Sequence, residues 1–146
     1  LSPVRGADAR RVGRRDARNV VVGELERAPD GEGGSCVIVA DTGHPSFFDH
    51  PQDHLPGTLL LEAYRQVALL AVADACAWAP ESLLVVACDA TFSRYAELDL
   101  EARCSASVGE PVLPRRGEPW VSVSLTVSQR GATLSEAVVR VADVRG

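Results

Sequence analysis

The longest apolar segment of the chain runs from residue 59 to about residue 77 and contains neither glycine nor proline. Leu, Ala and Val fill most of its positions, so a helix formed here is apolar nearly all round and is expected to be buried. Pro56-Gly57 precedes it, Thr58 stands at its expected N-cap, and Pro80 ends the helical region. The pattern therefore predicts one long central helix that other elements surround.

Alternating apolar and polar residues predict strands on both sides of this helix. Before it, residues 19–27 and 35–41 are expected to form a hairpin around a turn at 30–34. After it, three or four long strands are expected over about 83–95, 99–108, 120–129 and 132–144, with a tight turn at 129–132. This order is typical of an α+β fold in which a curved antiparallel sheet wraps the helix.

Composition narrows the class of protein. The 146 residues suit one domain, and 46% are hydrophobic without an apolar run of membrane-spanning length or a signal peptide, which predicts a soluble cytoplasmic protein that does not enter membranes. A net charge of −5 argues against nucleic-acid binding. The four cysteines lack metal-binding or redox spacing and are expected to be buried thiols: Cys36, Cys76, Cys88 and Cys104.

The absence of lysine and of methionine narrows the possible functions and origin of the chain. All fifteen cations are arginine, so no lysine is available for a Schiff base or a phosphate loop. The chain contains no methionine, and we expect it to be a piece of a longer polypeptide or a processed form. Residues 1–18 hold six arginines and are expected to be a basic, solvated linker, or a patch for an acidic partner or phosphate, ahead of a single domain at 19–146.

Polar residues gather where the predicted helix begins. Glu62, Arg65 and Gln66 stand at i, i+3 and i+4, so their side chains share one helix face. All three histidines, at positions 44, 50 and 54, lie in the loop just before it. We predict no metal site there, because a proline-rich loop does not hold three ligands in a regular geometry. The loop and the helix start are expected to bring a carboxylate, a guanidinium, imidazoles and free backbone N–H groups to one place.

The sequence of this region resembles that of hot-dog fold enzymes that act on acyl thioesters. Phe-Phe-Asp-His at 47–50, followed by Pro56-Gly57 and Leu-Glu-Ala at 61–63, is similar to the hydroxyacyl-carrier-protein dehydratases. The longer string at 41–66, with Asp-Thr-Gly-His-Pro at its start and Arg-Gln at its end, is more similar to the A-factor biosynthesis (AfsA) family of γ-butyrolactone synthases. The resemblance implies a hot-dog fold. Typical AfsA proteins carry two tandem repeats, and this chain looks like the second.

The resemblance also implies an activity. It is the transfer of a β-ketoacyl group from a thioester on the phosphopantetheine of an acyl carrier protein to a hydroxyl of dihydroxyacetone phosphate, followed by ring closure to a butenolide. Such an acyltransferase needs no other cofactor. At the end of a polyketide assembly line, the same step would release the finished chain.

Residue roles follow from that reaction. Glu62, with a pKa raised by desolvation beside an apolar tunnel, is the expected general base, and Arg65 is expected to hold the phosphate or to balance Glu62. Backbone N–H groups at the helix start are expected to polarise the thioester. Either His50 or His54 is expected to orient the acyl group or move a proton. The predicted catalytic residues are thus Glu62, Arg65, His50 and His54, and the predicted substrate-binding residues are Gly57, Thr58, Leu59 and Gln66.

Two other functions fit the same scaffold. One is a dehydratase or thioesterase acting on acyl-carrier-protein substrates without a phosphate acceptor, and the other is a non-catalytic hot-dog module that only supports dimerisation. In the simplest interpretation, Glu62 and Arg65 form an ordinary i,i+3 ion pair. A homodimer is expected in every case, because pairing two sheets edge to edge removes an exposed strand edge.

Overall fold

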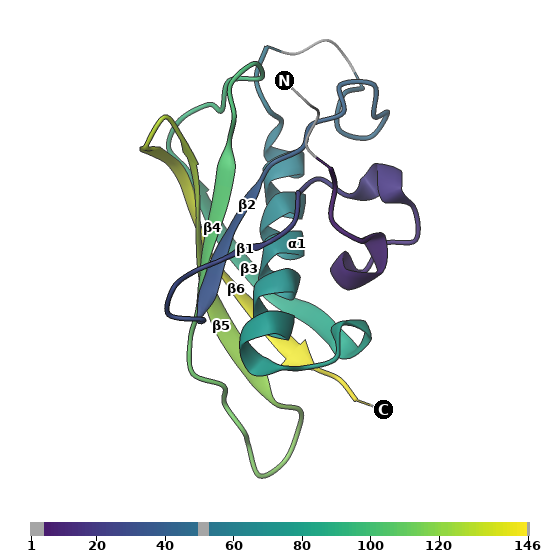
Figure 1. Cartoon of the computed structure of the whole chain (residues 1–146), viewed down its shortest axis with the longest axis vertical. Coiled ribbons are helices and arrows are strands. Elements are labelled where there is room, and N and C mark those ends of the chain that lie inside the picture. Colours follow the sequence, from purple (N-terminus) through teal and green to yellow (C-terminus); the bar gives the residue numbers. More distant parts are fainter. Residues whose placement is uncertain (1–4, 50–52, 146) are drawn as a thin grey trace.

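The computed structural model describes residues 5–49 and 53–145. Within these residues, a six-stranded antiparallel sheet curves around one long helix, α1 (Gly57–Cys76), as Figure 1 shows. The strands are β1 (Glu26–Arg27), β2 (Gly33–Val37), β3 (Leu83–Phe92), β4 (Arg103–Val108), β5 (Trp120–Gln129) and β6 (Ala132–Asp143). This arrangement confirms the predicted hot-dog fold, and no helix in the described ranges combines the length and apolar character that a membrane span requires.

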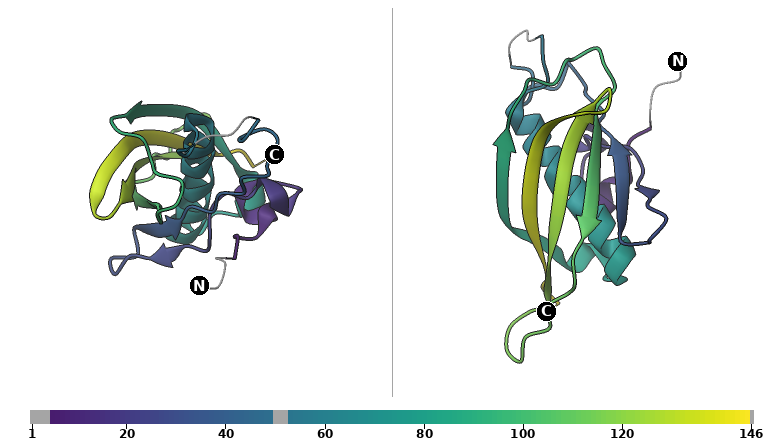
Figure 2. Two further views of the ribbon diagram at one scale, coloured as in Figure 1. Left: turned by 90° about the horizontal axis from the view of Figure 1, so that it is seen from above. Right: turned by 90° about the vertical axis from the view of Figure 1, so that its left-hand side faces the viewer.

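The strands follow the spatial order β1-β2-β4-β5-β6-β3, and every neighbouring pair is antiparallel. A two-residue turn joins β5 to β6, and both of its residues, Arg130 and Gly131, adopt positive φ angles of 50° and 77°. That conformation matches the right-handed twist of a hairpin, as the sequence predicts for this turn. Figure 2 shows the sheet and the helix that crosses its concave face, with β3 at one edge.

Helix α1 forms and is buried because its side chains are apolar on nearly every face. The residues from Val67 to Val72 are all buried and pack in one core with the inward-facing residues of the sheet. The helix begins at Gly57, with Pro56 as its N-cap and no side-chain capping bond. The prediction that Thr58 caps the helix was therefore wrong, because the chain already adopts helical geometry one residue earlier.

The first predicted hairpin is much shorter than expected. Only Glu26–Arg27 and Gly33–Val37 form ladder strands, whereas residues 19–25 contribute isolated bridges, such as that between Val22 and Ile38. Val20, Val21 and Val22 are nevertheless buried. The run of valines reports burial correctly, but the segment is bound to Gln66 of α1 rather than paired along its whole length.

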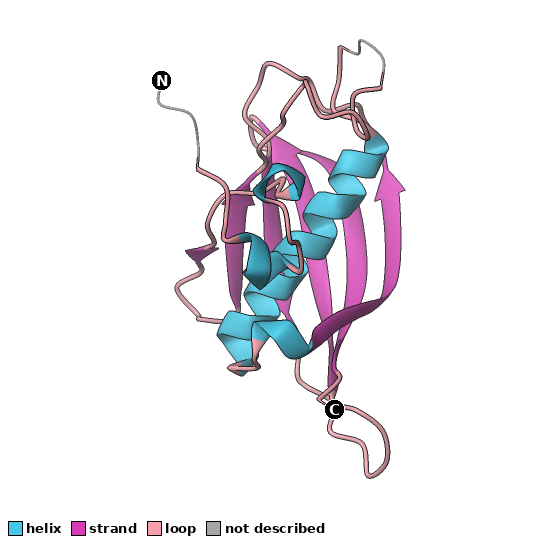
Figure 3. Cartoon of the chain, turned by 90° about the vertical axis from the view of Figure 1, so that its right-hand side faces the viewer, coloured by secondary structure: helices cyan, strands magenta, loops and turns pink. Residues whose placement is uncertain are grey.

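The N-terminal segment does not behave as a solvated linker over residues 9–19. It forms two 3₁₀ turns, η1 (Ala9–Val12) and η2 (Ala17–Asn19), which Asp8 and Asp16 cap through their carboxylates. Figure 3 shows these turns against the side of α1 that faces away from the sheet. Val12 is completely buried, and this one apolar residue among arginines fastens the segment to the core. Where the domain begins along the chain stays a prediction.

Candidate active site

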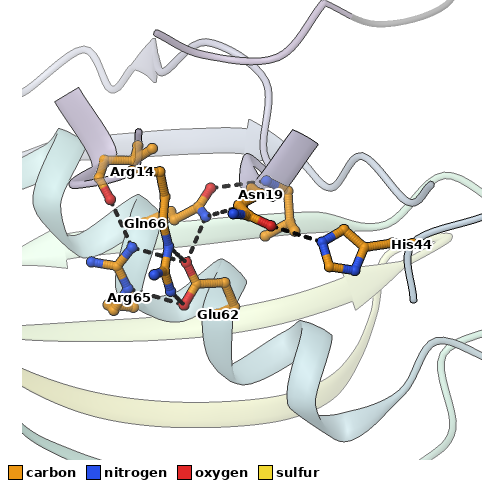
Figure 4. A network of polar contacts seen from close by, with 8 residues as sticks. Arg14, Asn19, His44, Glu62, Arg65 and Gln66 are labelled. Atoms are coloured by element: carbon orange, nitrogen blue, oxygen red, sulfur yellow. Dashed lines mark hydrogen bonds and ion pairs between the residues drawn. The ribbon is translucent and has the colours of Figure 1, made fainter. Parts of the chain in front are cut away.

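A charged cluster surrounds Glu62 near the start of α1 (Figure 4). Arg65, one turn further along the helix, donates from Nε to Oε1 at 3.0 Å and from Nη2 to Oε2 at 2.9 Å. Arg14, from the N-terminal segment, donates from Nε to Oε2 at 2.9 Å and lies 2.7 Å from Oε1 through Nη2. The side chain of Glu62 is 11% exposed, so one carboxylate holds two guanidinium forks in a mostly buried setting.

The pKa of Glu62 is lowered, whereas the sequence predicts that it is raised. Burial acts to raise the pKa, as expected, but hydrogen bonds from Arg65, Arg14 and the amide of Gln66 together outweigh burial. The result is a pKa of about 2, which keeps the carboxylate ionised at neutral pH. The predicted raised pKa was therefore wrong, and because a carboxylate with so low a pKa is a poor proton acceptor, the role of Glu62 as general base stays a prediction without support from its pKa.

Arg14 is the site residue that the sequence reasoning missed. Gly13, with φ of +68°, ends η1 and reverses the chain so that the next side chain points back to α1. Arg65 fixes this turn by donating to the carbonyl oxygen of Val12 at 2.7 Å. The signal in the sequence was weak. A valine between arginines at position 12, which is buried in the structure, was the one indication that this segment packs on the core.

Gln66 joins the cluster to the N-terminal segment. Its amide nitrogen donates to Glu62 at 2.7 Å and to the carbonyl of Asn19 at 2.8 Å, and its oxygen accepts from the N–H of Val21 at 2.9 Å. The side chain is completely buried and is occupied by protein groups. The amide of Gln66 holds Glu62 in place, and the predicted binding of substrate by Gln66 stays a prediction.

His44 ends the same network on the far side of Asn19. Its Nε2 lies 2.8 Å from Asn19 Oδ1, while its Nδ1 accepts from the backbone N–H of Ser46 at 3.1 Å, which places the proton on Nε2. His44 is buried and its ring packs on Phe47. These contacts agree with the structural role that its position before a proline and far from the helix suggests.

A largely apolar cavity of about 470 Å³ opens beside the charged cluster. Arg14, Glu62 and Arg65 form its polar end. Helix α1 and the loop before it supply one wall, and strands β3 and β6 supply the other. The residues of these walls are Phe47, Thr58, Leu61, Val85, Cys88 and Val139. The cavity can therefore hold an acyl chain with its reactive end next to the charges.

At the start of α1, only some of the backbone N–H groups that were predicted to be free lack an acceptor. Thr58 lines the cavity, and Gly57 is exposed as the first helical residue. The N–H groups of these two residues have no hydrogen-bond acceptor among the described residues. Leu59 differs, because its side chain is buried and its N–H donates to the carbonyl of Pro56 at 3.1 Å. The expectation of a free donor at Leu59 was wrong, since the first turn of the helix already uses it.

The structure separates the histidines from the cavity where it describes them. His50 lies outside the described residues. His54 is 2.9 Å from Asp53 through Nδ1 and packs on the ring of Tyr95 with centroids 4.5 Å apart. It forms a bridge with Glu97 and does not line the cavity beside Glu62. The predicted catalytic role of His50 or His54 stays a prediction.

The four cysteines differ in how deeply they are buried. Cys36 and Cys104 are buried opposite one another on β2 and β4, and burial raises their pKa values. Cys76 is half-buried at the end of α1, whereas Cys88 is exposed on the edge strand β3. The expectation of a buried thiol was wrong for Cys88, because this residue lies on the edge strand and lines the cavity beside Glu62. Over residues 5–49 and 53–145, no group of three or more His, Cys, Asp or Glu side chains is arranged to hold a metal.

Proteins of Streptomyces with a known name are similar in sequence to this chain. A protein of Streptomyces griseus named 2-oxo-3-(phosphooxy)propyl 3-oxoalkanoate synthase is 35% identical over 109 residues, which cover 75% of this chain and 33% of that protein. A protein of Streptomyces coelicolor with the same name is 41% identical over 68 residues, or 47% of this chain and 20% of that protein. The chain thus spans about a third of the length of the first of these relatives and less of the second.

Solved structures support the fold. The zebrafish thioesterase superfamily member 2 superposes with a TM-score of 0.67 and 14% identity, covering 91% of this chain and 90% of that one. At this identity the likeness establishes the hot-dog architecture alone. The model of the A-factor biosynthesis hotdog domain matches residues 2–144, nearly the whole chain. Fold, motif and family model agree, and the chain belongs to the AfsA family of hot-dog domains.

Proposed function

We propose that this domain takes part in esterifying dihydroxyacetone phosphate with a 3-oxoacyl group, the reaction that precedes butenolide ring closure. The observation that carries the proposal is the largely apolar cavity that ends at Glu62, Arg65 and Arg14. The name of the Streptomyces relatives describes an ester of this kind, with a 2-oxo-3-(phosphooxy)propyl group on a 3-oxoalkanoate. A 3-oxoacyl chain suits the apolar walls, and a phosphorylated polar acceptor suits the charged end.

The chemical step is an acyl transfer. The hydroxyl oxygen of the acceptor bonds to the acyl carbon, the carbon–sulfur bond of the thioester breaks, and the hydroxyl proton passes to the departing thiolate, which leaves as the thiol. The N–H groups of Gly57 and Thr58 lie at the positive end of a twenty-residue helix, where they can stabilise the negative charge that develops on the acyl oxygen. Removing one such donor from other enzymes slows the reaction by about two to three orders of magnitude.

Glu62 contributes by orientation. Its ionised carboxylate accepts from Arg14, Arg65 and Gln66 and holds both guanidinium groups in fixed positions at the end of the cavity. With a pKa of about 2 the carboxylate stays ionised at neutral pH, so this arrangement is kept. In this role it is a positioning carboxylate, and substitution with Gln should retain more activity than substitution with Ala.

We further propose that the acyl donor is a thioester on the phosphopantetheine of an acyl carrier protein. A thioester at the end of a long flexible arm suits a largely apolar cavity of which two lining residues, Thr58 and Leu61, are exposed to solvent. Within a polyketide assembly line, the same transfer would release the chain from its carrier. The step would require no other cofactor.

The direct test incubates the purified chain with a 3-oxoacyl pantetheine thioester and dihydroxyacetone phosphate. We expect a phosphorylated ester or butenolide by mass spectrometry, and a much smaller yield from Glu62→Ala. Thioester cleavage that proceeds equally well without the acceptor would indicate a thioesterase, and an untouched thioester would contradict catalysis by this domain. The Leu113→Lys variant is a suitable control, because Leu113 lies in the β4–β5 loop and is 73% exposed.

We also infer that β3 pairs with the same strand of a second copy to form a homodimer. β3 is an edge strand ten residues long, and Leu84, Val86 and Phe92 on it are about half exposed. Long apolar edges of this kind recruit other strands. We expect a dimer in sedimentation experiments at micromolar concentration, a monomer for Val86→Lys, and a dimer for Leu113→Lys. A wild-type monomer would contradict the inference.

A further inference from the structure

A second cavity, of about 840 Å³, lies next to the first and has a different character. It is formed by the N-terminal segment and by the 3₁₀ turn η3 (Pro80–Ser82), which follows α1. Its lining residues are Arg10, Arg11, Gly13, Arg14, Arg15, Pro80 and Glu81. Four guanidinium groups and one carboxylate therefore surround a space large enough for a phosphorylated ligand, in a protein whose net charge is −5.

Two of these four arginines are engaged and two are available. Arg11 pairs with Glu24 at 3.3 Å, and Arg14 pairs with Glu62. Arg10 and Arg15 are exposed, and their guanidinium groups make no ion pair with any described residue. Exposed cations that point into a cavity without a carboxylate partner are free to bind an anion.

Arg65, in contrast, is partly committed to the protein. Its Nε and Nη2 donate to Glu62, and Nη2 also donates to the carbonyl of Val12, which leaves only Nη1 without an acceptor among the described residues. A guanidinium with one nitrogen left cannot offer a phosphate the two parallel hydrogen bonds of a full fork. A phosphate that accompanies a substrate therefore needs further cations.

Arg14 connects the two cavities, because it lines both of them. A ligand that places a reacting carbon near Glu62 can thus extend past Arg14 into the basic cavity. Figure 4 shows Arg14 crossing from the N-terminal segment to Glu62 on α1. An apolar chain on one side of Arg14 and an anionic group on the other match the two ends of a phosphorylated acyl ester.

We propose that the basic cavity binds the phosphoryl group of a substrate, with Arg10 and Arg15 as its direct contacts. The inference rests on the proposed function and adds to it the site that holds the phosphate. Two substrates carry this chemistry, namely the acceptor dihydroxyacetone phosphate and the phosphopantetheine arm of the donor. Glu81 also lines this cavity, and its negative charge repels an anion and lowers the affinity for it.

The test measures the binding of three ligands to the full chain by calorimetry: dihydroxyacetone phosphate, phosphopantetheine, and unphosphorylated pantetheine. We expect the Arg10→Ala, Arg15→Ala double variant to weaken binding of at least one phosphorylated ligand by about tenfold or more. Glu81→Gln should strengthen it by about two- to threefold, because it removes a like charge. Arg116→Ala, in the exposed β4–β5 loop, is the matched control and should bind as the wild type does.

The pattern across ligands identifies the source of the phosphate. A loss confined to dihydroxyacetone phosphate supports an acceptor site, and a loss confined to phosphopantetheine supports a donor site. Equal affinity of the wild type and the double variant for both phosphorylated ligands would overturn the proposal. So would an equal loss for unphosphorylated pantetheine, which would indicate a general disturbance of the fold.

Experiments can distinguish a failure of the proposed phosphate site from a failure of the proposed acyl transfer. Product formation with an unchanged KM for dihydroxyacetone phosphate in the double variant, together with unchanged binding, would overturn the phosphate site and leave the acyl transfer intact. Phosphate-dependent binding without any product would retain the site and contradict the activity. The opposite signs expected for Arg→Ala and Glu81→Gln also distinguish a specific site from a loss of stability, which would weaken binding in both variants.

Discussion

Replacing Glu62 with Gln should make the stability of the domain less sensitive to acid. Glu62 has a pKa of about 2 in the folded protein, against an ordinary value of 4.5. A group whose pKa is depressed by folding stabilises the folded state above its unfolded pKa, and that contribution is lost as the pH falls toward the folded pKa. The relevant window therefore extends from about pH 5 down to about pH 2.

The two pKa values set the size of the effect. Their difference corresponds to about 3 kcal/mol at most, and solvent at Arg14, which is 39% exposed, screens part of it. By about pH 3, the wild type should have lost about 2 kcal/mol that the Gln variant does not lose. The variant should be less stable than the wild type at neutral pH, because the guanidinium groups of Arg14 and Arg65 then lack a carboxylate.

Urea unfolding at about pH 7, 5 and 3 measures this difference directly. We expect the gap in unfolding free energy between the wild type and Glu62→Gln to narrow steadily as the pH falls. Glu110→Gln is the matched control, because Glu110 is exposed and forms no ion pair with a described residue. A gap that stays constant from about pH 7 to about pH 3 would refute the argument that two arginines keep Glu62 ionised.

Three further substitutions test how the structure holds the site and sheet. Gln66→Leu removes two hydrogen bonds that tie α1 to residues 19–21 and a third to Glu62, and urea unfolding should show a loss of about 2–4 kcal/mol; an unchanged midpoint would contradict this role. Tyr64→Phe removes a 2.7 Å bond to a buried serine and should cost about 1–2 kcal/mol in thermal unfolding. Gly34→Ala places a Cβ 2.2 Å from a carbonyl oxygen of β1 and should cost about 3 kcal/mol or more, whereas Gly57→Ala, with open space around it, should be neutral.

The elements with the clearest periodicity are those that the sequence predicts well. Residues 120–129 alternate without a break and form β5 over the same range. The apolar run from residue 59 lies within α1, which starts two residues earlier. The segment at 19–25 shows where this reasoning fails. A run of valines reports that a segment is buried, but not whether its neighbour is a strand or a helix.

The candidate site is less accessible to sequence reasoning, because its charges come from distant parts of the chain. Glu62 and Arg65 are three residues apart, and their contact follows from helix geometry. Arg14 is separated from Glu62 by 48 residues, and only the tertiary fold brings them together. Because the contact of Arg14 with Glu62 was not predicted, the direction of the pKa change at Glu62 was not predicted correctly either. Desolvation alone predicts the opposite direction.

The left-handed turn at Gly13 makes the complete charged cluster depend on how residues 9–19 pack against α1. A Cβ at this position would lie 3.3 Å from Nη1 of Arg65, and an L-side chain would also strain the φ of +68°. Docking of residues 9–19 consequently brings Arg14 to a Glu62–Arg65 pair that lies within α1. A ligand bound between the two cavities should therefore slow amide hydrogen exchange along this whole segment, including residues it never touches.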